Sequence, residues 1–163
     1  MKAMLLGAVV SCAMLSPVAG QSKPAALQGA WRVTEITLTG PNARTIKNPQ
    51  PGMIVFTARH YANLTSARDE PRLALPPSKI DTATADELRA AWNLFTANAG
   101  TYEVVGDTLT WKVIVAKNQY AMNNHASQTY SMKLQGDTVT FVQKANESGP
   151  IANPTTFKLT RME

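Results

Sequence analysis

The chain has 163 residues, a formal net charge of +5 and a single cysteine. This length suits one domain with one hydrophobic core, and a single cysteine excludes an internal disulfide. The lysines and arginines are spread along the chain. The clustered basic stripe of a nucleic-acid-binding protein is therefore absent, and we expect no nucleic-acid partner.

The first twenty residues have the pattern of a cleavable signal peptide. Lys2 precedes an apolar run at residues 4–15, and the small residues of Val18-Ala19-Gly20 suit a signal peptidase. We therefore expect cleavage after Gly20, a mature chain that begins at Gln21, and a periplasmic or secreted protein. The apolar run is too short to span a bilayer, which takes about 20 residues, so no integral membrane segment is expected after cleavage.

Lipidation at Cys12 is the alternative for this segment, because Val9-Val10-Ser11-Cys12 loosely imitates a lipobox. The apolar run continues past Cys12, which favours simple cleavage. After cleavage, residues 21–26 are predicted to form a short flexible leader. Residues 27–163 are predicted to form one β-rich domain without a thiol.

Alternation of apolar and polar residues predicts short strands from residue 31 onward. The first covers residues 31–39, the second follows a polar loop and covers 53–57, and the third covers 61–67. Residues 69–82 include three prolines, which cannot lie in a central strand. This stretch is predicted to be a Pro-rich loop at the rim of the domain.

One helix is predicted over Thr84–Asn98. Either Thr82 or Thr84 can cap its N-terminus, and the acidic residues of the first turn suit the helix dipole. Apolar residues recur on one face at helical spacing: Leu88, Ala91, Trp92 and Phe95.

The final third of the chain contains an internal repeat. Tyr102–Trp111 aligns without a gap with Met132–Phe141. Each copy is two alternating runs joined at Gly-Asp, which predicts a β-hairpin, and a last strand covers residues 155–161. About eight strands with hairpin connections and one helix predict an all-β fold, a single antiparallel up-and-down β-barrel.

The two ends of the chain carry a matching pair of features: Gly29-Ala30-Trp31 stands at the entry to the first strand, and Arg161 stands on the last. This combination resembles the lipocalin signature. The resemblance implies that Trp31 closes the barrel floor and that Arg161 packs across its face through a cation–π contact. It thereby gives Gly29, Trp31 and Arg161 structural roles.

Several further segments follow one family pattern: Gln50–Tyr61, Asp69–Arg72, Gly100–Val104 and Ile114–Asn118, together with the Gly-Asp-Thr hairpins. Taken together, they resemble the lipocalin-like domain family of exported bacterial proteins. The resemblance implies an eight-stranded barrel with a helical element at one end. It implies no catalytic residues.

Side-chain alternation selects the candidate ligand-binding residues. Positions 111, 113, 115 and 117 share one face of a strand, and positions 61, 63 and 65 share one face of another. If both faces point inward, they mix aromatic surface with polar anchors, as ligand pockets do. The candidates are Tyr61, Asn63, Trp111, Val113, Val115, Lys117, Asn118 and Tyr130. The alternative is a filled core in which Trp111 is ordinary packing.

No residue pattern indicates a metal or cofactor site. His60 and His125 are the only histidines, and no carboxylate stands at a recognisable ligand spacing from them. A Gly-rich phosphate loop and a nucleophile elbow are also missing from the sequence. We therefore predict no metal, no cofactor and no catalytic residue.

Three functions remain open at this point. The first is a monomeric, exported binding protein for a small, largely apolar or amphipathic molecule, with the helix covering the barrel mouth or wall. The second is a small barrel enzyme of the isomerase or cyclase type, which would use His60, Tyr61 or Lys117 for proton transfer. The third is a filled barrel that acts through its surface in the cell envelope. A cavity inside the barrel would argue against the third.

Overall fold

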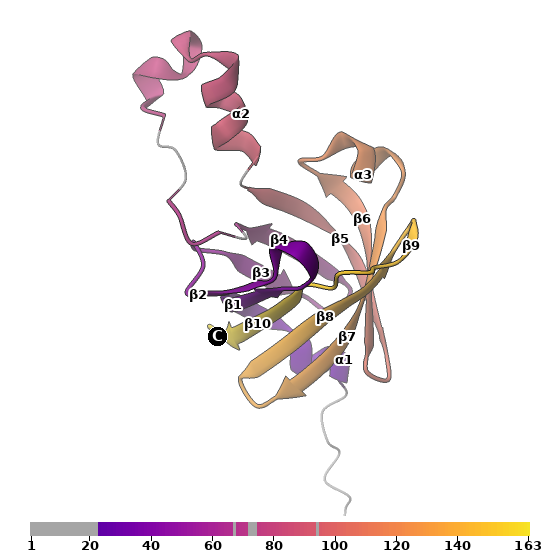
Figure 1. The fold of residues 1–163 in the computed structure, drawn as a ribbon. Helices are drawn as coiled ribbons and strands as arrows, with labels where there is room; N and C mark the ends of the chain where they lie inside the picture. Colours follow the sequence, from indigo (N-terminus) through magenta and orange to yellow (C-terminus); the bar gives the residue numbers. More distant parts are fainter. Residues whose placement is uncertain (1–22, 67, 72–74, 94) are drawn as a thin grey trace, which may run out of the picture.

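Eight antiparallel strands form a closed barrel (Figure 1). The computed structural model describes residues 23–66, 68–71, 75–93 and 95–163. The barrel strands are β1 (Gly29–Leu38), β3 (Met53–Phe56), β4 (His60–Thr65), β5 (Thr96–Val105), β6 (Thr108–Ala116), β7 (Ser127–Gln135), β8 (Thr138–Asn146) and β10 (Thr156–Arg161). They neighbour one another in the order β10-β1-β3-β4-β5-β6-β7-β8, and the pairing of β8 with β10 closes the ring. The predicted up-and-down barrel is confirmed.

Two further strands lie outside this ring. β2 (Arg44–Lys47) pairs with the second half of β1, and β9 (Gly149–Pro150) pairs with the end of β8. β2 follows a short 3-10 turn, η1 (Gly40–Asn42), in a stretch that the sequence predicts to be a polar loop. It forms there because Ile46, which is buried, joins the hydrophobic core.

The two copies of the internal repeat are the β5–β6 and β7–β8 hairpins, as predicted. Each reverses at Gly-Asp, and Gly106 (φ 59°) and Gly136 (φ 55°) take the left-handed conformation of the turn. Trp111 and Phe141 occupy the same position after their turns, and both are buried in the core. The repeat therefore places two large aromatic side chains inside the barrel.

The helix α2 (Ala85–Asn93) is shorter than predicted. It begins with a capping box, in which the Thr84 backbone N–H donates to Glu87 Oε2 (2.8 Å) and the Glu87 N–H donates to Thr84 Oγ1 (3.2 Å). The predicted end at Asn98 is wrong, because Asn98 lies in β5 and pairs with Asn63 of β4. Strand pairing outweighs the helical spacing of Phe95.

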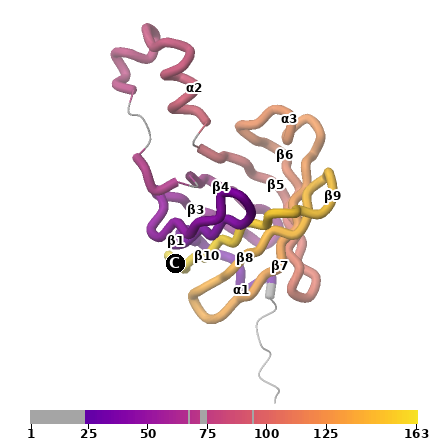
Figure 2. Tube along the Cα trace, viewed as in Figure 1, coloured from indigo at the N-terminus to yellow at the C-terminus, as the bar shows by residue number. Residues whose placement is uncertain are grey.

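α2 stands away from the barrel, next to the 3-10 segment η2 (Pro77–Thr82) of the Pro-rich stretch (Figures 1 and 2). Leu88 is 43% exposed and Trp92 is 60% exposed. The prediction that the apolar face of the helix covers the barrel mouth or wall is therefore wrong. Among the described residues, no helix is long and apolar enough to cross a membrane.

One end of the barrel is closed by a cluster of three residues, Gly29, Trp31 and Arg161, here called the floor cluster. Trp31 is fully buried, and its indole N–H donates to the Leu27 carbonyl oxygen at 2.7 Å. The Arg161 guanidinium lies 4.1 Å from the centre of the Trp31 ring. The predicted cation–π contact between the first and last strands is confirmed.

The floor cluster also contacts the short helix α1 (Lys23–Leu27). The sequence predicts a flexible leader over residues 21–26, and this prediction is wrong for residues 23–26, which are helical. The Arg161 guanidinium donates to the carbonyl oxygens of Gln28 (2.7 Å) and Ala26 (2.5 Å). These bonds satisfy carbonyls at the end of the helix, which have no partner within it. Residues 21 and 22 lie outside the described residues.

Gly29 fits the floor because it has no side chain. Its φ of 120° disfavours other residues, and a Cβ there would lie 2.6 Å from the Glu163 backbone oxygen and 2.9 Å from Arg161 Nη1. The chain could not pass under the guanidinium with a larger residue at this position. Figure 1 shows α1 at this closed end and α2 and the helix α3 (Gln119–Asn123) at the other.

We predict that Trp31→Ala lowers the free energy of unfolding by roughly 3–5 kcal/mol, as truncation of a large core aromatic does. Arg161→Ala should cost less, and the double variant should be non-additive because the two side chains touch. Urea unfolding of the four proteins measures this coupling. As a control, Trp31→Ala should combine additively with Lys112→Ala, whose side chain is exposed on β6, across the ring from β1. Zero coupling between Trp31 and Arg161 would contradict the assigned contact.

Candidate ligand-binding site

The barrel encloses a cavity of about 170 Å³, here called the inner cavity. Its lining comes from seven of the eight barrel strands and contains no Lys, Arg, Asp or Glu among the described residues. The residues that line it are Ile54, Asn63, Thr65, Thr96, Asn98, Trp111, Gln128, Tyr130, Phe141, Gln143 and Phe157. The interior is therefore open and uncharged.

One side of the inner cavity is polar. Asn63 pairs with Asn98 across β4 and β5, and Thr65 pairs with Thr96 two residues further along. Because side chains two residues apart on a strand share a face, the two pairs form one patch, here called the polar wall. Residues directly opposite in a register have Cβ atoms only about 5 Å apart, so the two asparagine amides are close neighbours.

The other side is aromatic. Phe141 of β8 pairs with Phe157 of β10, and these strands lie across the ring from β4 and β5 in the strand order. Tyr130 extends this surface, with its ring 6.0 Å from Phe141 and 4.9 Å from Trp111. These four residues, Trp111, Tyr130, Phe141 and Phe157, are here called the aromatic wall.

Three buried polar atoms on the cavity lining have no hydrogen-bond partner among the described residues: Asn63 Oδ1, Asn98 Oδ1 and Trp111 Nε1. The glutamines of the lining differ, because their side-chain oxygens are occupied. Tyr130 Oη donates to Gln128 Oε1, and the Thr155 backbone N–H donates to Gln143 Oε1 at 3.2 Å. The cavity thus presents two open acceptors and one open donor.

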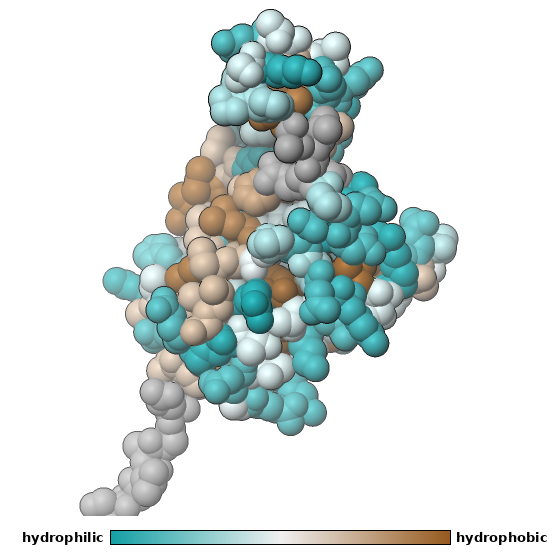
Figure 3. Space-filling view, turned by 90° about the vertical axis from the view of Figure 1, so that its left-hand side faces the viewer, coloured by the Kyte–Doolittle hydropathy of each residue, from teal (hydrophilic) through white to brown (hydrophobic). Residues whose placement is uncertain are grey.

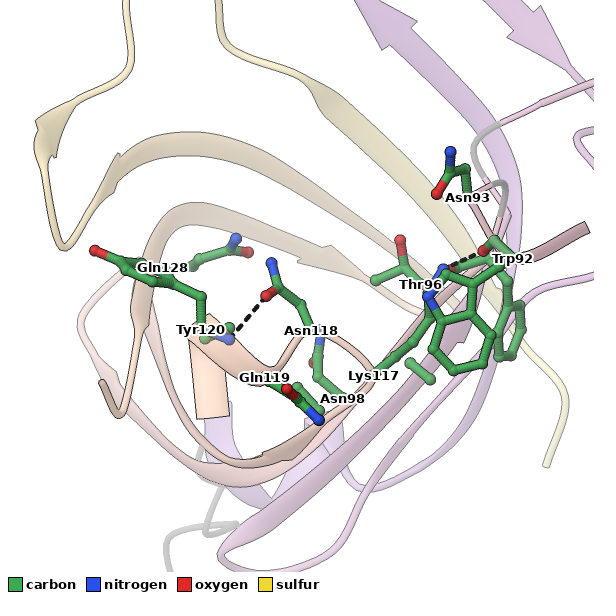
Figure 4. Close-up of a pocket in the computed structure, with 13 residues that line it drawn as sticks. Trp92, Asn93, Thr96, Asn98, Lys117, Asn118, Gln119, Tyr120 and Gln128 are labelled. Atoms are coloured by element: carbon green, nitrogen blue, oxygen red, sulfur yellow. Dashed lines mark hydrogen bonds between the residues drawn. The ribbon is translucent and has the colours of Figure 1, made fainter. Parts of the chain in front are cut away.

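A second hollow, here called the outer groove, lies at the open end of the barrel and has a volume of about 740 Å³. It runs between the end of α2 and α3; Figure 4 shows Tyr120, Asn118 and Gln128 on one side and Trp92 and Asn93 on the other. Thr96, Asn98 and Gln128 line both hollows. The inner cavity therefore opens toward the outer groove.

Lys117 and Asn118 line the outer groove rather than the inner cavity, and each has a structural contact (Figure 4). Lys117 Nζ donates to the carbonyl oxygens of Phe95 (2.6 Å) and Trp92, and it lies 4.7 Å from the centre of the Trp92 ring. Asn118 Oδ1 accepts from the Tyr120 backbone N–H at 3.0 Å and caps α3. Lys117 thus links the end of α2 to the barrel through hydrogen bonds and a cation–π contact.

The predicted inward orientation of Val115 is wrong. Val113 is buried but lies outside the cavity lining, whereas Val115 is 54% exposed. The cause is a β-bulge: Gly100 pairs with Val113 and Ala99 with Val115, so Ile114 is an extra residue. Val115 continues an outward row with Ala99 and Ala62, and Figure 3 shows apolar side chains gathered on a flank of the barrel below α2.

Of the other predicted site residues, Asn63, Trp111 and Tyr130 line the inner cavity. Tyr61 is buried beside it and stacks on Trp111, with ring centres 4.5 Å apart and planes 18° apart. The sequence analysis missed Asn98 because the predicted helix, Thr84–Asn98, includes this residue. It also missed Phe141, although the internal repeat makes this residue the counterpart of Trp111.

The lining offers little for acid–base chemistry. Tyr130 is the one titratable side chain on it among the described residues, and burial raises the pKa of its hydroxyl. His60 and His125 are exposed on the surface, and Lys117 is bound to carbonyl oxygens. Within the described part of the chain, no three His, Cys, Asp or Glu residues lie close enough to hold a metal ion.

Burial raises the pKa of Tyr61 from its ordinary value of 10.0 to about 12. The neutral hydroxyl is favoured in the folded state, so its contribution to stability is complete below pH 10 and disappears as the pH rises from 10 to 12. The Tyr61 hydroxyl is buried without a partner among the described residues, so we predict that Tyr61→Phe does not destabilise the fold at pH 7 and raises its free energy of unfolding if it changes it. The variant should also lose about 2–3 kcal/mol less stability than the wild type when the pH is raised to 12. Urea unfolding at pH 7 and pH 12 measures both, with the exposed Tyr120→Phe as control. Equal losses in wild type and Tyr61→Phe would contradict the assignment.

A family model of the lipocalin-like domain matches residues 28–159. A search of the curated proteins finds no match to this chain. The matched span includes every residue of the inner cavity and two members of the floor cluster, Gly29 and Trp31, and it ends two residues before Arg161. The chain belongs to the lipocalin-like domain family, whose barrel implies the binding of a small ligand.

Proposed function

We propose that this barrel binds one small, largely apolar or amphipathic molecule in the inner cavity. The observation that carries the proposal is the set of three buried polar atoms on the lining that have no partner among the described residues. A buried polar group without a hydrogen bond costs about 1–3 kcal/mol. A bound molecule that pairs with these atoms removes that cost, whereas a core built only for stability would carry apolar side chains there.

The size of the inner cavity suggests the size of the ligand. An apolar protein cavity of about 150 Å³ binds benzene, and the inner cavity measures about 170 Å³. One six-membered ring with a small substituent therefore fits. A longer molecule would extend past Thr96, Asn98 and Gln128 into the outer groove.

The open interior also bears on the two alternatives. A filled barrel that acts only through its surface leaves no room for a cavity of this size. A barrel enzyme needs a proton-transfer group beside its substrate, and among the described residues the lining brings together no acid–base pair. Binding is therefore the function that the geometry supports best.

We predict that filling the inner cavity abolishes binding. Thr65 is buried and lies on the polar wall, so Thr65→Phe would occupy the space beside the Asn63–Asn98 pair. A panel of single-ring compounds, from toluene to benzamide, should include at least one that raises the melting temperature of the wild type, since ligands stabilise the state that they bind. Thr65→Phe should show no such rise.

The matched control is Val115→Phe, which adds the same side chain at an exposed position outside the lining. It should bind the compounds as the wild type does. Circular dichroism of both variants checks that the barrel is intact. Equal stabilisation of Thr65→Phe and Val115→Phe would place the compounds on the surface and refute binding in the inner cavity.

We also propose that the protein is exported, with cleavage after Gly20; the supporting pattern lies in residues 1–20, outside the described residues. Protein recovered from its source should begin at Gln21 by N-terminal sequencing, and Gly20→Glu should remain uncut because a small residue is needed at this position. A chain that still begins at Met1 would contradict export by cleavage, and an acylated Cys12 would establish the lipoprotein alternative.

A further inference from the structure

We infer that the ligand of the inner cavity is a neutral, single-ring molecule that carries an amide group, with the amide on the Asn63–Asn98 pair and the ring on the aromatic wall. This inference rests on the proposed function and goes further by assigning the chemical class and the orientation of the ligand.

The first argument is charge. Among the described residues, no Lys, Arg, Asp or Glu lines the inner cavity, and an ion that leaves water without a counter-charge pays a large desolvation cost. A carboxylate would also face Asn63 Oδ1 and Asn98 Oδ1, which are acceptors like itself. Anions are therefore excluded by both the missing partner and the wrong hydrogen-bonding pattern.

Cations need a separate argument, because aromatic rings and amide oxygens can also attract them. A cation would leave the buried Trp111 indole N–H unpaired, because it offers no acceptor. It would also enter past Lys117, which lines the outer groove at the open end of the barrel. The unpaired indole N–H of Trp111 and the positive charge of Lys117 at the open end of the barrel both favour a neutral molecule over a cation.

The second argument is hydrogen-bond complementarity. Two acceptors and one donor are open on the lining, and a primary amide offers two N–H donors and one carbonyl acceptor. The three atoms come from consecutive strands, β4, β5 and β6, and the two asparagines are directly paired. A hydroxyl or an ether could pair with only some of them.

The third argument is shape. Phe141 and Phe157 lie across the barrel from Asn63 and Asn98, and Tyr130 lies between Phe141 and Trp111 in the chain of ring contacts. A molecule between these walls has one polar edge and one flat apolar body. A ring packed against aromatic side chains meets this requirement with favourable stacked or edge-on contacts.

The test uses four compounds that share one ring and differ in one substituent: benzamide, toluene, benzoate and benzylammonium. Calorimetric titration of the full chain should show benzamide binding at least about tenfold more tightly than toluene, because toluene leaves all three polar atoms unpaired. Benzoate and benzylammonium should bind at least about tenfold more weakly than benzamide. Benzamide should also shift the indole N–H resonance of Trp111, assigned through Trp111→Phe, while that of Trp31, already bonded to Leu27, stays in place.

Asn63→Leu tests the contact itself, since leucine has a similar volume and no acceptor. Benzamide should lose about tenfold or more in affinity and toluene should lose none, so the preference between them falls or reverses. Asn123→Leu is the control, because Asn123 is exposed on α3 and lines neither hollow. It should leave both affinities unchanged.

Each other outcome overturns the inference in a recognisable way. If toluene binds as tightly as benzamide and Thr65→Phe blocks it, the cavity binds ligands but the amide assignment is wrong. If benzylammonium or benzoate binds most tightly, the assigned neutrality is wrong. If none of the four compounds binds the wild type, the amide assignment fails together with the single-ring binding from which it starts.

Discussion

The Arg161 guanidinium lies 4.1 Å from the centre of the Trp31 ring and joins the last strand of the barrel to the first. Trp31 and Arg161 are also register partners, so this contact continues the β1–β10 pairing that, with β8–β10, closes the ring. The same guanidinium donates to carbonyls at the end of α1. The floor cluster thus closes one end of the barrel, while the strand pairings leave the ring without a free edge. The opposite end can then remain open without exposing the core.

The proposed binding site lowers the stability of the empty barrel. Asn63, Asn98 and Trp111 each keep a buried polar atom without a partner among the described residues, at a cost of about 1–3 kcal/mol each. Positions that break the usual rule of satisfied polar groups are expected at functional sites. Among the described residues, two further unpartnered atoms, Tyr61 Oη and Ser66 Oγ, lie outside the lining. The three on the lining belong to strands, so strand pairing rather than a loop fixes their positions.

Local sequence signals predicted the parts of this structure that local interactions determine. The Gly-Asp turns located both hairpins, and the alternation after the first turn placed Trp111 among the candidates for the interior of the barrel. Asn98 could not be found in the same way. The helical spacing of Leu88, Trp92 and Phe95 predicts a helix that continues through Asn98, whereas this residue pairs with β4 and belongs to β5. Val115 was misplaced because the bulge at Ile114 reverses the alternation, and a bulge of this kind depends on the partner strand. Both errors arise where tertiary pairing overrides a local pattern.

Native mass spectrometry of the protein purified from its source tests most directly the claim that the inner cavity holds one small molecule. We predict that the wild-type protein carries the added mass of a single small neutral compound, and that Thr65→Phe, purified in parallel, does not. Val115→Phe should carry the same added mass as the wild type. The bare mass of the chain in all three proteins, or the same added mass in Thr65→Phe, would contradict the claim.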